Sequence, residues 1–160
     1  MVYLLNHNFF DQIASDIIGV LALNSTFAVT PEQRDAWLGE IEVLQRCLDR
    51  REGSIYLEFS IPRMGKRIDA VLLIRGVVFI LEFKVGEDRF TEAALNQVWD
   101  YALDLKNFHK GSHSAPIVPI LIATEANQVP QEMPHVDEDR VYRPLRSNEA
   151  TLPRILNEVI

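Results

Sequence analysis

Apolar residues recur every three or four positions in several stretches of the chain, which is the spacing of helices that bury one face. This pattern predicts helices at residues 9–23, 31–50, 91–109 and 152–160. The second helix has the clearest start, because Thr30 can cap it, Pro31 suits its first position and Gln33 its third. Its apolar seam, which should face the core, consists of Trp37, Ile41, Leu44 and Leu48.

Other stretches alternate apolar and polar residues or are apolar almost throughout, which is typical of strands. They predict strands at residues 55–61, 68–74, 77–84 and 116–124, and a short edge strand at 141–145. Alternation in the first of these strands predicts one face made of Ile55, Leu57, Phe59 and Ile61, and an opposite face made of Tyr56, Glu58 and Ser60.

The second and third predicted strands form a hairpin, because Arg75 and Gly76 between them make a tight turn. The hairpin is apolar at nearly every position, so both of its faces should be covered. The predicted order is two helices, three strands, a helix, a strand, and then a strand and a helix. Such an order describes an α/β domain.

The length of 160 residues fits a single domain that spans residues 1–160. No apolar run reaches the ~18 residues of a membrane helix, and the N-terminus lacks the features of a signal peptide. The single cysteine, Cys47, excludes an internal disulfide, should pack inside a helix, and fits a reducing cytoplasm. From the apolar last residue, Ile160, we expect this domain to be the N-terminal part of a longer protein.

Three charged residues interrupt the apolar hairpin. Asp69 lies within the second strand, and Glu82 and Lys84 lie at the end of the third. Side chains alternate along a strand, so Glu82 and Lys84 share a face, and the hairpin can bring Asp69 beside Glu82. A buried carboxylate is costly unless it is paired or binds a metal. A buried ion pair between Lys84 and one acid is the simplest interpretation, but it leaves the second acid unexplained.

A divalent metal site accounts for both acids. Mg²⁺ prefers hard oxygen ligands, which Asp69, Glu82 and the backbone carbonyl of Phe83 would supply. Such an ion would polarise a scissile phosphate and lower the pKa of a bound water. Lys84 would orient that water and stabilise the charge that develops on the phosphate.

Two of the predicted helices can complete this site. Glu40 lies between Trp37 and Leu44 on the buried seam, so it is a candidate for a further acid that reaches the metal, whereas Glu42 should point to solvent. Glu40 can equally be an ordinary, partly exposed helix residue. On the next helix, Gln97 and Tyr101 are four residues apart and share a face.

The ordered set Glu40, Gly65-x-x-x-Asp69, Glu82-x-Lys84 and Gln97-x-x-x-Tyr101 resembles the PD-(D/E)XK nuclease superfamily, and most of all its RecB-like branch. The likeness covers residues 33–124, and it departs from the pattern at Ile68, where many members have proline. It implies a restriction-endonuclease-like α/β core with a mixed central sheet flanked by helices. It also implies Mg²⁺ or Mn²⁺ as cofactor and hydrolysis of nucleic-acid phosphodiesters, with DNA the expected substrate.

The resemblance assigns a role to each matching residue. Asp69 and Glu82 match metal ligands, Lys84 the catalytic lysine and Glu40 the helix acid. Gln97 and Tyr101 match an accessory pair. Residues 97–106 and 119–121 are also similar to nuclease-like domains that precede bacterial superfamily 1 helicases, so a helicase domain in the same protein is an expected partner.

The net charge of −7 keeps other functions open. A protein that binds nucleic acid passively is normally basic, whereas an enzyme can use a cation to bring a phosphate near carboxylates. A binding or scaffold module that keeps the fold and cuts nothing is therefore an alternative, as is a structural domain whose polar cluster only fixes the core. Cations that can contact phosphates or simply lie in solvent are Arg63, Lys66, Arg67, Lys106 and Lys110.

Overall fold

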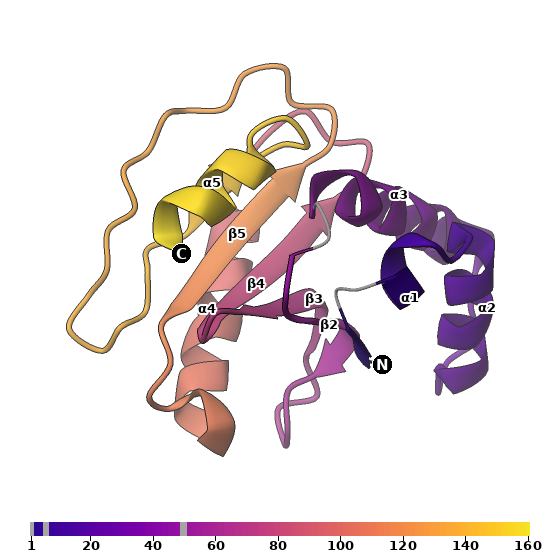
Figure 1. Ribbon diagram of the computed structural model, residues 1–160, viewed down its shortest axis with the longest axis horizontal. Coiled ribbons are helices and arrows are strands. Elements are labelled where there is room, and N and C mark those ends of the chain that lie inside the picture. Colours follow the sequence, from indigo (N-terminus) through magenta and orange to yellow (C-terminus); the bar gives the residue numbers. More distant parts are fainter. Residues whose placement is uncertain (1, 5–6, 49–50) are drawn as a thin grey trace.

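The computed structural model describes residues 2–4, 7–48 and 51–160. Within these ranges one six-stranded sheet forms the centre, and its strands follow the order of the chain (Figure 1). The pairs from β1 to β4 are antiparallel and the pairs from β4 to β6 are parallel, so the predicted α/β class with a mixed sheet is confirmed. The strands are β1 (Val2–Leu4), β2 (Ser54–Ser60), β3 (Arg67–Ile74), β4 (Val77–Lys84), β5 (Ile117–Ala123) and β6 (Leu145–Ser147).

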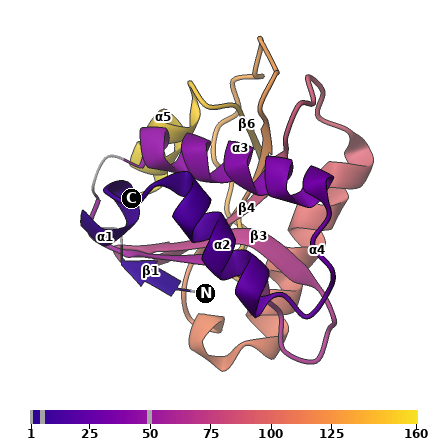
Figure 2. The same ribbon diagram turned by 90° about the vertical axis from the view of Figure 1, so that its right-hand side faces the viewer.

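Helices cover both faces of the sheet, as the apolar hairpin predicted (Figures 1 and 2). One core, which includes Trp37 and Phe79, lies between the sheet and α2, α3 and α5. The other core, which includes Val98 and Ile80, lies under α4. The helices are α1 (His7–Phe10), α2 (Ala14–Asn24), α3 (Pro31–Cys47), α4 (Glu92–Phe108) and α5 (Leu152–Val159), with a 3-10 turn η1 (Lys110–Ser112). No helix in the described ranges is long and apolar enough to cross a membrane.

The starts of the two long helices follow from their caps. The hydroxyl of Thr30 accepts a hydrogen bond from the N–H of Gln33 at 3.2 Å, as predicted for the start of α3. Thr91 caps α4 in the same way through the N–H of Ala94, at 3.2 Å. The end of α3 was expected near residue 50, but the helix ends at Cys47, and residues 49–50 lie outside the described ranges.

The prediction of one helix over residues 9–23 is wrong, because the chain is extended at Ile13 between α1 and α2. The break leaves backbone carbonyls without helical partners, and the side-chain amide of Gln45 on α3 donates to two of them, those of Phe9 and Gln12, each at 2.9 Å. Ile13, which lies in this break, is 69% exposed. A tertiary contact thus satisfies the backbone groups that a continuous helix would pair.

The predicted alternation along β2 is correct only as far as Leu57. Ile55 and Leu57 pack on the α3 face, whereas Phe59 and Ile61 pack on the α4 face. Glu58 is the cause, because its φ of 53° lies in the left-handed region and shifts the alternation by one position. The prediction that all four apolar residues share a face is therefore wrong.

Two edge strands differ from the prediction. The short strand expected at residues 141–145 begins instead at Leu145, and Val141 makes only an isolated bridge to Ile117. Pro144 lies between them and has no N–H to donate to a ladder. At the other edge, β1 was not predicted, and it pairs with β2 through three residues.

Candidate active site

The charged residues of the hairpin lie where the β3–β4 ladder stops. Its last pair is Ala70 with Leu81, directly before Asp69 and Glu82. Beyond this pair, the side chain of Asp69 accepts the next hydrogen bond from β4, because its Oδ2 accepts from the N–H of Phe83 at 2.8 Å. A cleft of about 620 Å³ opens at this point, lined by β2, β3, β4, α4 and the loop before α3.

Lys84 is held beside this cleft by two acceptors that line it. Its Nζ donates to Glu82 Oε1 at 3.1 Å and to Gln97 Oε1 at 3.2 Å. The amide of Gln97 in turn donates to the hydroxyl of Tyr101 at 2.8 Å, which fixes the orientation of the amide, because lysine can only donate. An ammonium has three N–H donors, so the third donor of Lys84 stays available to the cleft.

A group of carboxylates lies beside this chain of hydrogen bonds. Glu40 on α3 is only 7% exposed, and its carboxyl makes no hydrogen bond or ion pair with the described residues. Carboxylate oxygens of Glu40, Glu58 and Asp69 all lie within 4.8 Å of one another. The sequence placed Glu40 near the buried seam, and its burial confirms that placement.

Glu58 is the member of this group that sequence reasoning missed. The alternation of β2 put it on a polar face, but its left-handed backbone instead turns it toward α3. There Oε1 accepts a hydrogen bond of 2.8 Å from the indole N–H of Trp37, and the carboxylate pairs with Arg67. The available signal was the antiparallel register, which sets Glu58 opposite Asp69, between the pairs Leu57–Ala70 and Phe59–Ile68.

Negative charge exceeds positive charge around this cluster. Glu40, Glu58, Asp69 and Glu82 face the cations of Lys84 and Arg67. A single ion pair of Lys84 with one acid therefore does not neutralise the negative charge of the site. Buried carboxylates must then keep a proton or bind a cation.

The pKa values of the carboxyl groups express this imbalance. Burial raises the pKa of Glu40 well above its usual range, and the charges of Asp69, Glu58 and Glu82 raise it further. Burial, followed by the charge of Glu82, raises the pKa of Asp69, against the opposing effect of the hydrogen bond from Phe83. Burial also raises the pKa of Glu82, although Lys84 opposes this shift.

The donor set fits Mg²⁺ or Mn²⁺. An octahedral ion with bonds of about 2.1 Å places its ligands about 3–4 Å apart, which the spacing of the three carboxylates allows. Oε2 of Glu82 is shielded from solvent and has no hydrogen-bond partner in the described part of the chain. A bound cation would supply the missing partner for this oxygen. Of the predicted ligands, the structure brings Glu40, Asp69 and Glu82 to one place. The N–H of Phe83 is used by Asp69, and its carbonyl as a metal ligand stays a prediction.

Most of the predicted phosphate-binding cations already have partners. Lys66 and Arg67 line the cleft, but Lys66 pairs with Asp104 at 2.7 Å and Arg67 pairs with Glu58. Lys106 donates to the carbonyl of Ala115 at 3.0 Å, away from the cleft. Substrate contact by Lys66 or Arg67 would therefore compete with an existing ion pair.

Comparisons with models of protein families, with curated proteins and with solved structures found no match to this chain.

Proposed function

We propose that this domain is a Mg²⁺- or Mn²⁺-dependent nuclease of the PD-(D/E)XK class, which hydrolyses phosphodiester bonds of nucleic acid, with DNA as the expected substrate. The observation that carries the proposal is the position of Lys84, held by Glu82 and Gln97 beside a carboxylate cluster whose negative charge exceeds the positive charge of Lys84 and Arg67. Within the class, the 2.8 Å hydrogen bond between Gln97 and Tyr101 supports the RecB-like branch.

Each residue of the cleft then has a defined task. Asp69, Glu82 and Glu40, with Glu58 beside them, would hold the ion, which when bound polarises a phosphate and acidifies a water. Lys84 would donate its third N–H to the attacking water or to a phosphate oxygen, where negative charge grows in the transition state. Gln97 would keep Lys84 in place, and Tyr101 would keep Gln97 in place.

The test of this proposal is a calorimetric titration of the full chain with Mn²⁺ and Mg²⁺, beside a cleavage assay on single- and double-stranded DNA and RNA. We expect binding of a divalent ion and cleavage that EDTA abolishes. Asp69→Asn should weaken binding about 10–100-fold, because it removes a charged ligand and keeps the shape of the side chain. Absence of any metal binding would sink the proposal.

Binding without cleavage on any of these substrates would favour the scaffold alternative, in which the fold keeps its ion and only holds nucleic acid. The helicase partner stays a prediction. The reading frame that follows codon 160 tests it, since superfamily 1 helicase motifs should appear there.

Glu58 provides a second, independent prediction. Glu58→Gln should weaken Mn²⁺ binding about tenfold, because the variant keeps an acceptor for the indole of Trp37 but removes one negative charge next to Asp69. The matched control is Glu42→Gln, which removes the same charge from an α3 side chain that is 47% exposed. Equal affinities for wild type and Glu58→Gln would exclude Glu58 from the metal site.

A further inference from the structure

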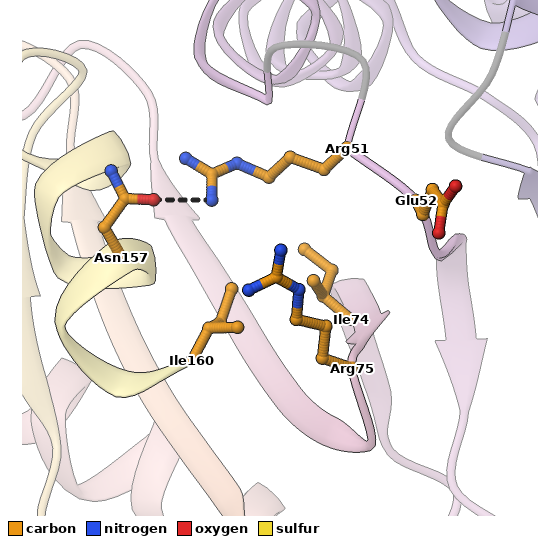
Figure 3. A pocket seen from close by; sticks show the side chains of 6 residues that line it. All are labelled: Arg51, Glu52, Ile74, Arg75, Asn157 and Ile160. Carbon is orange, nitrogen blue, oxygen red and sulfur yellow. Dashed lines mark hydrogen bonds between the residues drawn. The ribbon is translucent and has the colours of Figure 1, made fainter.

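A second polar pocket lies at the far end of the hairpin from the carboxylate cluster. It has a volume of about 220 Å³ and lies between the β3–β4 turn, the segment before β2 and the end of α5. Figure 3 shows the guanidinium groups of Arg51 and Arg75 extending into the same space, with Ile74 and Ile160 as apolar walls. Asp69 is five residues before Ile74 in the same strand, about 17 Å away at the usual rise per residue, so the two sites are separate.

Neither guanidinium has an anionic partner among the described residues. Arg51 donates from Nη1 to the neutral amide oxygen of Asn157 at 2.8 Å, and its Nε–H is shielded from solvent and has no acceptor in the described ranges. Glu52 also lines the pocket, but it forms no ion pair with either arginine, and Figure 3 shows it at the opposite side. In a chain of net charge −7, two neighbouring arginines that form no ion pair with a described carboxylate are available to bind an anion.

The backbone at Arg75 is a separate observation that points to the same role. Arg75 has a φ of 49° and Gly76 a φ of 79°, so the two-residue turn is left-handed at both positions. Hairpin turns of this kind favour Asn followed by Gly, because a long side chain with a Cβ is strained in the left-handed region. An arginine at this position carries a conformational cost that a structural turn does not require, which is a common sign of a functional side chain.

We propose that Arg51 and Arg75 form a binding site for a phosphate group, independent of the nuclease activity proposed above. Two guanidinium groups present planar N–H donors and two positive charges, which match a doubly charged phosphate monoester or inorganic phosphate better than a singly charged carboxylate. The pocket also leaves room along Ile74 and Ile160 for the organic part of a phosphate ester.

The experiment is a titration of the metal-free full chain with inorganic phosphate, followed by NMR of the arginine side chains or by calorimetry in EDTA. We expect saturable binding by the wild type, and binding weaker by about tenfold or more in Arg75→Asn, which removes one charge-assisted contact. Because asparagine is favoured in this turn, Arg75→Asn should fold at least as well as the wild type, so lost binding would not reflect unfolding. Arg51→Met should show the same loss.

Arg154→Met is the matched control, because this arginine lies on α5, the helix that carries Asn157, but pairs with Glu158 at 2.9 Å. Its phosphate affinity should equal that of the wild type. A short oligonucleotide with a 5′-phosphate, compared with its 5′-hydroxyl form, distinguishes the end of a nucleic acid from free phosphate as the source. Unchanged phosphate binding in Arg75→Asn, no binding by the wild type, or equal displacement by acetate would each overturn the proposal. Because no metal is present, these outcomes do not depend on whether the carboxylate cleft cleaves nucleic acid.

Discussion

Replacing Lys84 with methionine is expected to lower the rate of metal-dependent cleavage by about 10³-fold, the cost of removing one donor aimed at developing charge, and to leave metal binding nearly intact. The ammonium is fixed by Glu82 and Gln97, so only its remaining N–H can face the substrate. Methionine keeps the length and much of the apolar stem of lysine. The affinity for Mn²⁺ should therefore change far less than the rate, because the carboxylates stay in place.

The measurement is single-turnover cleavage at saturating Mn²⁺, with calorimetry on the same samples. Lys106→Met serves as the control, because Lys106 is also partly buried and hydrogen-bonded, but to a backbone carbonyl outside the cleft. It should cleave as fast as the wild type. If Lys84→Met also cleaved at the wild-type rate, Lys84 would be no more than the partner of a buried acid.

Replacing Glu40 with glutamine is expected to stabilise the metal-free protein at pH 8, by about 1–3 kcal/mol. The carboxyl of Glu40 is buried, makes no hydrogen bond with the described residues and lies among other acids, so its ionised form is unfavourable in the folded state. Glutamine keeps the volume and removes the charge. Thermal and urea unfolding in EDTA would measure the change in the free energy of unfolding.

The pH dependence of this effect has a definite sign. The pKa of Glu40 is higher in the folded protein than its ordinary value of 4.5. Between these two values the folded state binds more protons than the unfolded state, so the wild type loses stability as the pH rises through that window. Below about pH 4.5 the carboxyl is protonated in both states, and the advantage of Glu40→Gln should disappear.

Saturating Mn²⁺ should reverse the order of stability at pH 8. Binding to the folded state stabilises the wild type, and Glu40→Gln binds the ion more weakly. Glu42→Gln, on the exposed side of the same helix, should follow the wild type in both conditions. A cluster that only fixes the core would give no reversal, and that outcome would support the structural alternative.

The sequence alone determined the elements whose signals are local. The cap at Thr30 and the apolar run of β4, predicted at residues 77–84 and found at Val77–Lys84, depend on neighbouring residues only. The charged positions within such elements were equally readable. Asp69, Glu82 and Lys84 interrupt apolar strands, and a short hairpin leaves few ways to arrange them.

The tertiary structure decided what depends on contacts between distant segments. At the break between α1 and α2, the free backbone carbonyls accept hydrogen bonds from Gln45, which is more than thirty residues away. The local periodicity of residues 9–23 could therefore not reveal the break. The position of Glu58 depends on one left-handed residue, with Trp37 and Arg67 as partners on other elements. A single φ angle moves a strand side chain to the opposite face, and no residue pattern within β2 records that angle.

The same distinction applies to the two sites. Each candidate residue of the cleft except Glu58 could be named from the sequence, because spacing along a strand or helix fixes which side chains share a face. The approach of Glu40 to Asp69 required the packing of α3 against the sheet, and the position of Arg51 beside Arg75 follows from the β2–β3 register, in which Ser54 pairs with Leu73. Periodicity determines which face of an element is buried, whereas only the packed fold determines which charges lie together without a partner.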